Sequence, residues 1–438
     1  MSNQKENLGY VDVVMGASWG DEGKGKIVHF LSKDYDLGVR PHGGPNAGHS
    51  LEINSDVVVL NSIPCTIFSI PSLCGAGMVI NPILFIQEIE KVTKYGADVH
   101  KNLYISNEIH LILPTHILID KAEEAYKGKN KIGSTHQGIG PTYKDKAGRD
   151  GLRMGDIFSP DFEQRFKNLM NRHIDYVNSM LKFEFNMEED VVKPAQEFLN
   201  ATTELKKLKN FVHCSTFVNS YLKKGGRILS EGAQAAMLDL DFGTYPFVTS
   251  SRCLASAVPG ELAIPAQSIR KVYGVLKAYT TRVGSGPFPT KITGELEDEL
   301  RALGHEYGAR TKRPRDVGWL DFPQLNLAVM ENGITDLVVT KLDIFDELKG
   351  DSVKICTQYM LGGEKKDILD FDLVQKGSEV EPMYVDFELW KNVKTNSIRS
   401  FDALPKEAKE YIDYIETILG VPVSIVSVGP GKDDLIVK

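Results

Sequence analysis

A strand, a glycine-rich loop and a helix follow one another near the start of the chain. Residues 10–15 have the β-branched pattern of a buried strand, and residues 24–32 have the apolar spacing of a helix. Because short apolar runs and helical stretches continue to alternate, the sequence predicts an α/β fold with a large, mainly parallel central sheet and helices on both faces. The further strands that we expect are residues 103–106, 111–114, 227–229, 272–280, 337–340 and 423–428.

The rest of the chain shows one helical insertion and no clear domain boundary. Asn81 and Pro82 supply an N-cap and a first-turn proline for an amphipathic helix. Residues 160–224 are mostly helical in pattern and highly charged, so we interpret them as a helical insertion. No internal repeat and no Gly/Ser-rich linker divides the sequence. We therefore expect residues 10–438 to form a single α/β domain after a flexible N-terminal tail at residues 1–9.

The charge balance and the apolar segments exclude several classes of protein. The chain has 51 Lys and Arg against 59 Asp and Glu, a net charge of −8, so an extended nucleic-acid footprint is not expected. The longest apolar stretch, residues 74–86, is interrupted and is shorter than the roughly 20 residues of a membrane helix. The polar N-terminus lacks the apolar core of a secretory signal, which favours a cytoplasmic protein. Five cysteines without a C-x-x-C motif favour reduced structural thiols.

The loop between the first strand and the first helix has the composition of a phosphate-binding cradle. Glycines let backbone N–H groups approach a phosphate, lysines add positive charge, and the helix N-terminus adds its dipole. The spacing Gly20-x4-Gly25-Lys26 nearly matches a P-loop, but Ile27 stands where a Ser or Thr hydroxyl would bind Mg²⁺. Asp21 is an oxygen donor inside the loop. A carboxylate beside phosphates is expected to hold a metal ion or to transfer a proton.

A second polar segment, residues 40–50, contains Asn46 and His49 among small residues that would let a ligand approach the backbone. A histidine near a phosphate can donate to developing negative charge or transfer a proton. A lone histidine is more often an ordinary polar residue, so this segment by itself does not identify a catalytic group.

Residues 340–343, with the sequence TKLD, follow an expected strand and indicate a guanine site. Lys341 and Asp343 leave the carboxyl end of that strand on the same side. An aspartate there can accept N1–H and N2–H of guanine, whereas adenine lacks those donors and would leave the carboxylate unpaired. The sequence therefore favours GTP over ATP. The turn at residues 429–431 is expected to close over the base.

Two more segments carry polar groups that could bind a substrate. Residues 310–315 hold four basic residues, and the alternating Thr311, Arg313 and Arg315 could converge on a carboxylate or a phosphate. A solvated charged loop is the alternative. Gln234 follows an expected strand and offers an amide that both donates and accepts.

Six short segments together are specific enough to indicate a protein family when their order and spacing are considered. They are WGDEGKGK at 19–26, NAGH at 46–49, GIGP at 138–141, EGAQ at 231–234, GTYP at 243–246 and TKLD at 340–343. From about residue 10 to the C-terminus, the chain resembles the adenylosuccinate synthetase family. The resemblance implies a fold related to P-loop GTPases and, usually, a homodimer. It also implies a GTP- and Mg²⁺-dependent ligase that joins IMP to L-aspartate in purine nucleotide biosynthesis.

The same resemblance implies roles for four catalytic residues. Asp21 matches the general base that removes the N1 proton of IMP, which makes the 6-oxygen a nucleophile toward the γ-phosphate of GTP. His49 matches the acid partner of the transferred phosphoryl group, Gln234 the group that holds the 6-oxygen, and Lys24 the cation of the cradle. The aspartate amine then displaces phosphate from the 6-phosphoryl-IMP intermediate, so one difficult substitution becomes two easier ones.

Binding residues are implied position by position. The implied contacts to IMP are Asn46, Thr135, Arg149, Gln234, Thr249, Val283 and Arg313. The implied contacts to aspartate are Thr311 and Arg313. The implied contacts to GTP are Gly20, Glu22, Gly23, Lys24, Gly25, Lys26, Gly48, Arg315, Lys341, Asp343, Ser427 and Gly429. The implied ligands of one Mg²⁺ ion are Asp21 and the carbonyl of Gly48. Arg149 resembles the arginine that the family lends to the IMP phosphate of the neighbouring subunit.

Three positions depart from the family pattern, and two other functions compete with the synthetase interpretation. The departures are Gln137, Lys312 and Pro314, which affect the expected aspartate and IMP loops.

A GTP-dependent switch protein would use the same cradle and would hydrolyse GTP without IMP. A ligase that activates a carboxylate would phosphorylate a different acceptor. Ile27 and the additional IMP-like polar groups disfavour the switch protein.

Overall fold

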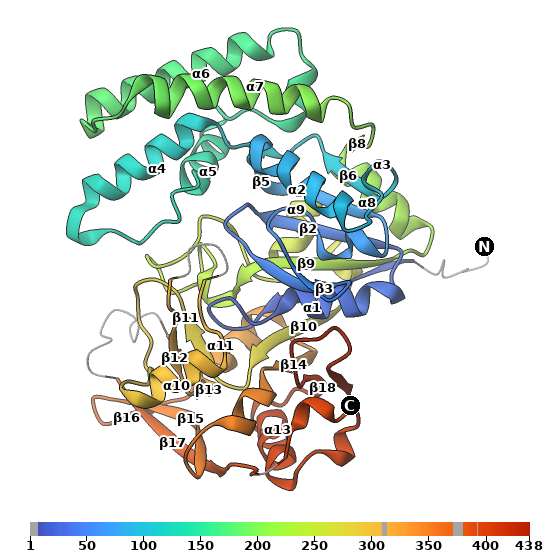
Figure 1. Ribbon diagram of the computed structural model, residues 1–438, viewed down its shortest axis with the longest axis vertical. Coiled ribbons are helices and arrows are strands. Elements are labelled where there is room, and N and C mark those ends of the chain that lie inside the picture. Colours follow the sequence, from blue (N-terminus) through green and yellow to red (C-terminus); the bar gives the residue numbers. More distant parts are fainter. Residues whose placement is uncertain (1–7, 309–312, 371–379, 392) are drawn as a thin grey trace.

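A computed structural model describes residues 8–308, 313–370, 380–391 and 393–438, and it is built around a large twisted sheet (Figure 1). The strands of this sheet are β1 (Tyr10–Gly16), β2 (Leu37–Gly43), β5 (Ser72–Ile80), β6 (Leu103–Ser106), β7 (His110–Leu111), β8 (Phe211–Val212), β9 (Arg227–Ala235), β10 (Ile269–Lys277), β14 (Asp336–Thr340), β18 (Val423–Ser427) and β19 (Leu435–Val437). Their order is β19-β18-β14-β10-β1-β9-β2-β5-β6-β8, with β7 beside β5. The paired strands are parallel except β18 and β19, which confirms the predicted sheet.

Helices cover both faces of the sheet. They are α1 (Lys24–Leu31), α2 (Pro82–Lys94), α3 (Val99–Asn102), α4 (Pro114–Lys127), α5 (Ile139–Gly148), α6 (Phe162–Tyr176), α7 (Lys193–Leu205), α8 (Cys214–Lys223), α9 (Ala257–Leu262), α10 (Glu295–Leu303), α11 (Phe322–Asn332) and α13 (Lys406–Leu419). In β1, Val13 and Met15 belong to one apolar cluster and Val14 to another, because successive side chains of a strand point to opposite faces. Helices α8, α9, α11 and α13 complete the first cluster, and α1, α2, α4, α6 and α7 complete the second.

The segment expected as a helical insertion contributes two long helices to one end of the molecule. In Figure 1, α6 and α7 form the uppermost layer, with α4 and α5 below them. Two π-helical segments, Val177–Leu181 and Met187–Val192, lie between α6 and α7. Residues 160–224 are therefore mainly helical, as predicted, although β8 joins the edge of the central sheet and α8 contacts β9.

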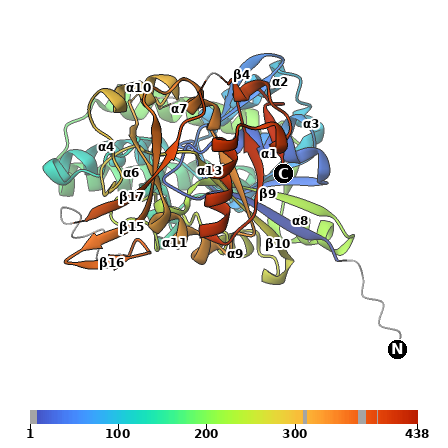
Figure 2. The ribbon, with the colours of Figure 1, turned by 90° about the horizontal axis from the view of Figure 1, so that it is seen from below.

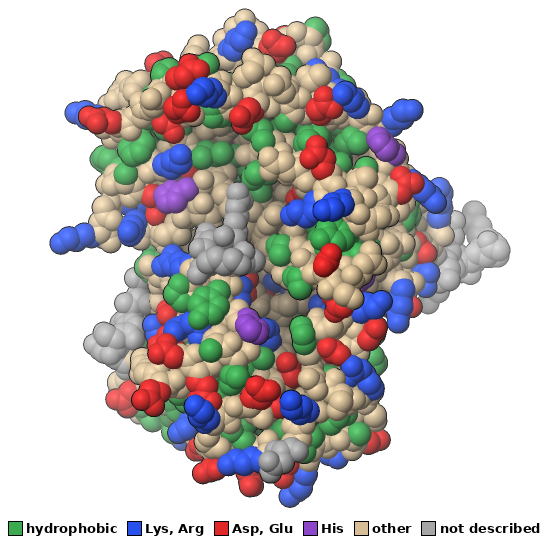
Figure 3. Space-filling model, viewed as in Figure 1, with side chains coloured by type: hydrophobic (Ala, Val, Ile, Leu, Met, Phe, Trp, Pro, Cys, Tyr) green, Lys and Arg blue, Asp and Glu red, His purple; other side chains and the backbone are tan. Residues whose placement is uncertain are grey.

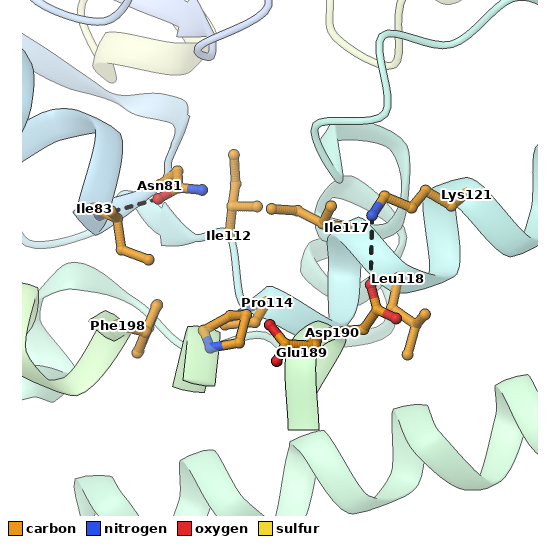
Figure 4. Close-up of a pocket in the computed structure, with 11 residues that line it drawn as sticks. Asn81, Ile83, Ile112, Pro114, Ile117, Leu118, Lys121, Glu189, Asp190 and Phe198 are labelled. Atoms are coloured by element: carbon orange, nitrogen blue, oxygen red, sulfur yellow. Dashed lines mark hydrogen bonds and ion pairs between the residues drawn. The ribbon is translucent and has the colours of Figure 1, made fainter. Parts of the chain in front are cut away.

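A small cavity lies between α2, α4 and α7. Its volume is about 120 Å³, and apolar side chains such as Ile83, Ile117 and Phe198 line much of it. At its edge, Lys121 Nζ lies 3.7 Å from Asp190 Oδ1 (Figure 4). None of the site residues predicted from the sequence lines this cavity.

Several strand predictions differ from the structure because the apolar pattern does not mark where a strand ends. β9 extends to Ala235, so Glu231 and Gln234 lie within the strand and not after it. The apolar stretch at residues 74–86 is divided between β5 and the beginning of α2. β7 is shorter than predicted and ends before Pro114, whose fixed φ begins α4.

Two other differences concern strands near the proposed site. The strand expected at 272–280 is β10, which ends at Lys277 and is followed by the separate strand β11 (Thr280–Arg282). β2 was not predicted, and it contains the first residues of the polar segment 40–50. Polar and glycine-containing strands escape a pattern search that relies on β-branched residues.

Smaller sheets accompany the central one. They consist of β3 (His49–Ile53) with β4 (Asp56–Leu60), of β11 with β12 (Asp316–Gly318), and of β13 (Leu320–Asp321), β15 (Ser352–Leu361), β16 (Glu364–Lys366) and β17 (Glu381–Glu388). Figure 1 places β15, β16 and β17 at the end of the molecule that lies opposite α6 and α7, and in Figure 2, which is seen from below, these strands lie nearer the viewer.

Other expectations from the composition can be compared with the described residues. The five cysteines are free and buried, as predicted for structural thiols. Acidic and basic side chains are interspersed on the face shown in Figure 3. Among the helices that the structure describes, none has the length and apolar character needed to cross a membrane.

Candidate nucleotide-binding and catalytic site

The glycine-rich loop between β1 and α1 holds an anion of its own. The Glu22 carboxylate accepts hydrogen bonds from the N–H groups of Ser18 at 3.3 Å and Gly20 at 2.8 Å, and from Lys24 Nζ at 2.7 Å. Glu22 is 2% exposed, and a Cβ at Gly16 would lie 2.4 Å from its Oε2. Backbone donors and a lysine therefore converge on one negative group, which is the arrangement that a phosphate requires.

Asp21 lies next to this anion and is paired with an arginine from a distant segment. Its backbone has a left-handed φ of 63°. Its Oδ2 lies 2.8 Å from Arg315 Nε, and Arg315 Nη1 donates to Glu306 Oε2 at 2.7 Å. The structure thus brings together the predicted base and a predicted GTP contact. Asp21 is 32% exposed, so a substrate can reach its carboxylate.

His49 lies at the beginning of β3, and its Nδ1 is hydrogen-bonded to the Glu231 carboxylate of β9. Both side chains are buried, and Glu231 also accepts from the N–H of Cys65 at 2.7 Å. Burial lowers the pKa of His49, against the raising effect of the Glu231 charge. Burial would raise the pKa of Glu231, but the His49 interaction and other contacts lower it overall. The pair is thus an ionised carboxylate that accepts Nδ1–H from a neutral imidazole, which leaves Nε2 for a ligand.

Close packing brings His49 to the phosphate cradle. A Cβ at Gly25, in the first turn of α1, would lie 3.0 Å from the Cβ of His49 and 3.1 Å from the carbonyl oxygen of Ser50. The glycine therefore allows the helix N-terminus to approach β3, and the predicted catalytic histidine lies beside the predicted phosphate site.

Gln234 and Asn46 present polar atoms that lack protein partners among the described residues. Both side-chain atoms of the Gln234 amide and Oδ1 of Asn46 are buried without a hydrogen bond there. Asn46 Nδ2 donates to Thr249 Oγ1 at 3.4 Å, which brings two of the predicted IMP contacts together. Gln234 has a left-handed φ of 53° at the end of β9. Buried amides without partners are costly, so these groups are arranged for a polar ligand.

Lys26 connects the cradle to the last part of the chain. Its Nζ donates to Ser427 Oγ at 2.9 Å, to the Gly429 carbonyl at 2.8 Å and to the Asp434 carbonyl at 3.0 Å. Burial lowers the pKa of Lys26 to about 8, and the charge of Asp434 opposes this effect. Three predicted GTP contacts thus meet where β18 ends. In this structure the Lys26 ammonium binds that turn and not an anion in the cradle.

The segment after β14 touches the cradle directly. Thr340 Oγ1 donates to the Glu22 carbonyl at 2.7 Å. Lys341 has a left-handed φ of 62°, and its Nζ donates to the Gly304 carbonyl at 2.8 Å. Burial raises the pKa of Asp343, while the charge of Lys341 lowers it. The predicted guanine-binding segment and the predicted phosphate loop are therefore parts of one site.

Comparisons with known proteins agree with this geometry. A family model described as adenylosuccinate synthetase matches residues 13–436. The chain belongs to the adenylosuccinate synthetase family. It is 46% identical over 431 residues to the adenylosuccinate synthetase of Flavobacterium johnsoniae, covering 98% of this chain and 100% of that protein. It is 44% identical over 430 residues to the one from Parabacteroides distasonis, covering 98% and 99%. The structure of fully ligated adenylosuccinate synthetase from Plasmodium falciparum matches with a TM-score of 0.89 and 38% identity, covering 98% of this chain and 100% of that one.

Membership of the adenylosuccinate synthetase family confirms the fold, the family and the reaction expected from the sequence. The chain is a ligase of purine nucleotide biosynthesis that joins IMP to L-aspartate in a GTP-dependent reaction. The matches give no support to a GTP-dependent switch protein.

Several residues that the family resemblance implies are exposed or lie outside the described residues. Thr135 is exposed in the loop before α5, Arg149 is exposed at the end of α5, and Val283 is 38% exposed after β11. Thr311 lies outside the described residues, as does the departing residue Lys312. Arg313, the other member of the implied aspartate-binding pair, is among the described residues.

Sequence reasoning missed two buried carboxylates that hold proposed site residues of this synthetase. Glu231 lies within the EGAQ motif, and its location in a buried strand beside Gln234 was the available signal for its contact with His49. Glu306 holds Arg315 but lies in a segment without a recognisable motif. Only its contacts with Arg315 and Lys277 in the structure identify Glu306 as a residue that supports the site.

Proposed function

We propose that the ligation of IMP and L-aspartate takes place where the phosphate cradle, the His49–Glu231 pair and the segment after β14 meet. The observation that carries this proposal is the buried Glu22 carboxylate in the cradle, bound by two backbone N–H groups and Lys24. A loop that binds a carboxylate in this way has the donors to bind a phosphate. Asp21 and Gln234 supply the polar groups for the acceptor beside it.

In this proposal, two substitutions occur in sequence. Asp21 removes the N1 proton of IMP, and the 6-oxygen then attacks the γ-phosphorus of GTP, so that GDP leaves and 6-phosphoryl-IMP forms. Nε2 of His49 becomes protonated as negative charge develops on the phosphoryl group, and it then donates a hydrogen bond to that group. The Gln234 amide holds the 6-oxygen. The aspartate amine then attacks C6, and the 6-oxygen leaves with the phosphoryl group as inorganic phosphate.

A Mg²⁺ ion fits the oxygen donors of this site. The Asp21 carboxylate and the Gly48 carbonyl are hard ligands of the kind that magnesium prefers, and Asp21 is accessible in this structure. When bound, the ion would neutralise charge on the phosphates. To bind the ion, the Asp21 carboxylate would have to give up its contact with Arg315, which involves only Oδ2 of Asp21 in this structure.

The binding subsites follow the residues implied by the family. We assign the phosphates of GTP to the N–H groups of the cradle and to Lys24, and the guanine to Asp343 and the turn after β18. The Lys26 contacts to Ser427 and Gly429 support a single GTP subsite that spans the two ends of the chain. We assign IMP to Asn46, Gln234 and Thr249, and aspartate to Thr311 and Arg313.

A homodimer would complete the IMP subsite. Arg149 has a left-handed φ of 66° at the end of α5, and its side chain is exposed. This location suits a side chain that reaches into a neighbouring subunit, so we assign it to the IMP phosphate of the partner. We also propose a cytoplasmic location, because the five cysteines are free and buried, as is usual for proteins of a reducing compartment.

The decisive assay follows GTP consumption with Mg²⁺ while IMP or aspartate is omitted in turn, together with the absorbance of a 6-substituted purine. We expect GDP and the new purine to form in equal amounts, and only when IMP and aspartate are both present. GTP hydrolysis that is equally fast without IMP would overturn the acceptor assignment and favour the switch protein. GTP-dependent phosphorylation of a carboxylate would favour the alternative ligase.

A further inference from the structure

Four charged side chains of alternating sign form a continuous chain that begins in the phosphate cradle. It begins with Asp21 and Arg315, whose Oδ2 and Nε lie 2.8 Å apart. Arg315 Nη1 donates to Glu306 Oε2 at 2.7 Å. The other oxygen of Glu306 accepts from Lys277 Nζ at 2.8 Å and from the Tyr279 hydroxyl at 2.6 Å. Glu306 therefore holds the arginine on one side and a lysine and a tyrosine on the other.

The inner members of this chain are almost completely shielded from solvent. Lys277 and Glu306 have side-chain exposures of 2% and 0%, and Arg315 is 11% exposed. Burial would raise the pKa of Glu306, but the charges of Lys277, Lys341 and Arg315 lower it to about 2, so the carboxylate remains ionised. A buried ion pair seldom stabilises a fold more than apolar residues of the same size would. Its presence here therefore points to a geometric role.

Backbone contacts reinforce the geometry. Residues 306–308 and 313–315 form the two sides of a hairpin stem, in which Arg315 N–H donates to the Glu306 carbonyl at 2.9 Å and Gly308 N–H to the Arg313 carbonyl at 2.8 Å. Glu306 and Arg315 are thus paired through both backbone and side chains. The Lys277 end of the chain lies at the carboxyl end of β10 in the central sheet. The sheet therefore anchors the stem that carries Arg315.

We propose that Glu306 is a positioning residue that, together with Lys277, fixes the Arg315 guanidinium beside Asp21 before GTP binds. The inference rests on the GTP-binding role proposed for Arg315. Arg315 uses Nη1 for Glu306 and Nε for Asp21, so a phosphate oxygen can replace Asp21 while Glu306 keeps its hold. This exchange frees the Asp21 carboxylate for its proposed role and leaves the guanidinium on the phosphates.

The first test is a double-mutant cycle on kcat/KM for GTP in the full-length enzyme. Glu306→Gln keeps the size of the side chain but removes its charge, and we expect kcat/KM for GTP to fall about tenfold while KM for IMP changes less than about twofold. Arg315→Met should lower kcat/KM for GTP further than Glu306→Gln does. In the Arg315→Met background, Glu306→Gln should cause no further loss, because the side chain that it positions is absent.

A second variant separates positioning from folding. Glu306→Gln leaves the Lys277 ammonium buried without its carboxylate and should lower Tm. The double variant Glu306→Gln with Lys277→Met removes both charges, so Tm should recover toward that of the parent enzyme while kcat/KM for GTP remains low. Lys271→Met is the matched control: it lies at the other end of β10 and pairs with Asp336 at 2.9 Å, and its kcat/KM should remain within about twofold.

Each outcome bears on one proposal or the other. If kcat/KM for GTP recovers together with Tm in the neutral double variant, Glu306 has only a structural role and the inference is wrong. If the Glu306→Gln loss is the same with and without Arg315, the inference is wrong although Arg315 still binds GTP. If Arg315→Met has the parent kcat/KM, the role proposed for Arg315 fails, and the positioning role of Glu306 fails with it.

Discussion

Asp21 combines two functions at the scale of a single residue, since it is the proposed general base and a proposed ligand of Mg²⁺. Its left-handed backbone and its contact with Arg315 hold the carboxylate beside the cradle. Asp21→Asn keeps the shape of the side chain, but the amide cannot remove a proton. We expect kcat to fall at least about 10²-fold. Steady-state turnover with saturating substrates measures this, with Tm as the control for folding, and near-normal turnover would refute the assignment.

Asp343 offers a test of base recognition at the same scale. Asp343→Asn should raise KM for GTP more than KM for IMP, because only the guanine N1–H and N2–H donors lose their acceptor. Xanthosine triphosphate, which carries an oxygen in place of the 2-amino group, should become a better substrate for the variant than for the parent enzyme. KM values for the three nucleotides provide the comparison. An unchanged KM for GTP would show that Asp343 does not contact the base.

At the scale of elements, the approach of α1 to β3 joins the phosphate cradle to the catalytic histidine. A methyl group at Gly25 would lie 3.0 Å from the Cβ of His49. Gly25→Ala should therefore separate the helix N-terminus from β3 and lower kcat/KM for GTP by roughly tenfold, the effect of a small misplacement in a catalytic site.

Gly260→Ala is the matched control for this prediction. Gly260 also lies in a helix, α9, and a Cβ there would meet no atom within 4 Å. Alanine should leave activity unchanged and stabilise the helix by up to about 1 kcal/mol. Equal activity of the two alanine variants would show that the close approach of α1 and β3 is not needed for catalysis.

At the scale of the whole molecule, the proposed dimer predicts complementation between two inactive variants. Asp21→Asn and Arg149→Ala should each be nearly inactive alone. If Arg149 acts in the neighbouring subunit, a mixed dimer contains one site with both native side chains, and an equal mixture that exchanges subunits should reach about one quarter of the parent activity. Activity after mixing, with subunit exchange verified by differently tagged chains, tests this. Exchange without recovered activity would place Arg149 within its own site.

The stability of the whole molecule should depend on pH through a buried carboxyl group. Asp321 is inaccessible to solvent, accepts from the Tyr359 hydroxyl at 2.6 Å and caps α11 through the Gln324 N–H. Burial raises the pKa of Asp321 to about 7, with these hydrogen bonds opposing the effect. Between the unfolded pKa near 4 and the folded pKa, the folded state holds the extra proton, so its stabilising contribution is lost as pH rises through this interval.

Asp321→Asn removes this titration and retains an acceptor for the cap. From pH 5 to pH 8, the free energy of unfolding of the parent should fall relative to that of the variant by on the order of 2 kcal/mol. Urea unfolding at several pH values gives the difference, in which other titrating groups largely cancel. A difference that stays constant with pH would mean that Asp321 titrates alike in the folded and unfolded chains.

The sequence by itself determined the features that depend on neighbours along the chain. The strand, glycine-rich loop and helix at residues 10–32 predicted the cradle, because glycine spacing and apolar periodicity are local properties. The order of the six motifs, from residue 19 to residue 343, was sufficient for the family and hence for the reaction. Strand ends were less certain, as the length of β9 shows.

Only the tertiary structure decided which side chains support one another inside the site. Lys26 and Ser427 are separated by 401 positions, and His49 and Glu231 by 182, yet each pair is in contact. Such pairs depend on the order of strands in the sheet and on the loops at their ends, which no local pattern contains. The partnership of Glu306 with Lys277 likewise arises where a hairpin stem meets the carboxyl end of β10. Buried charges must find partners in space, and the fold alone determines which charges meet.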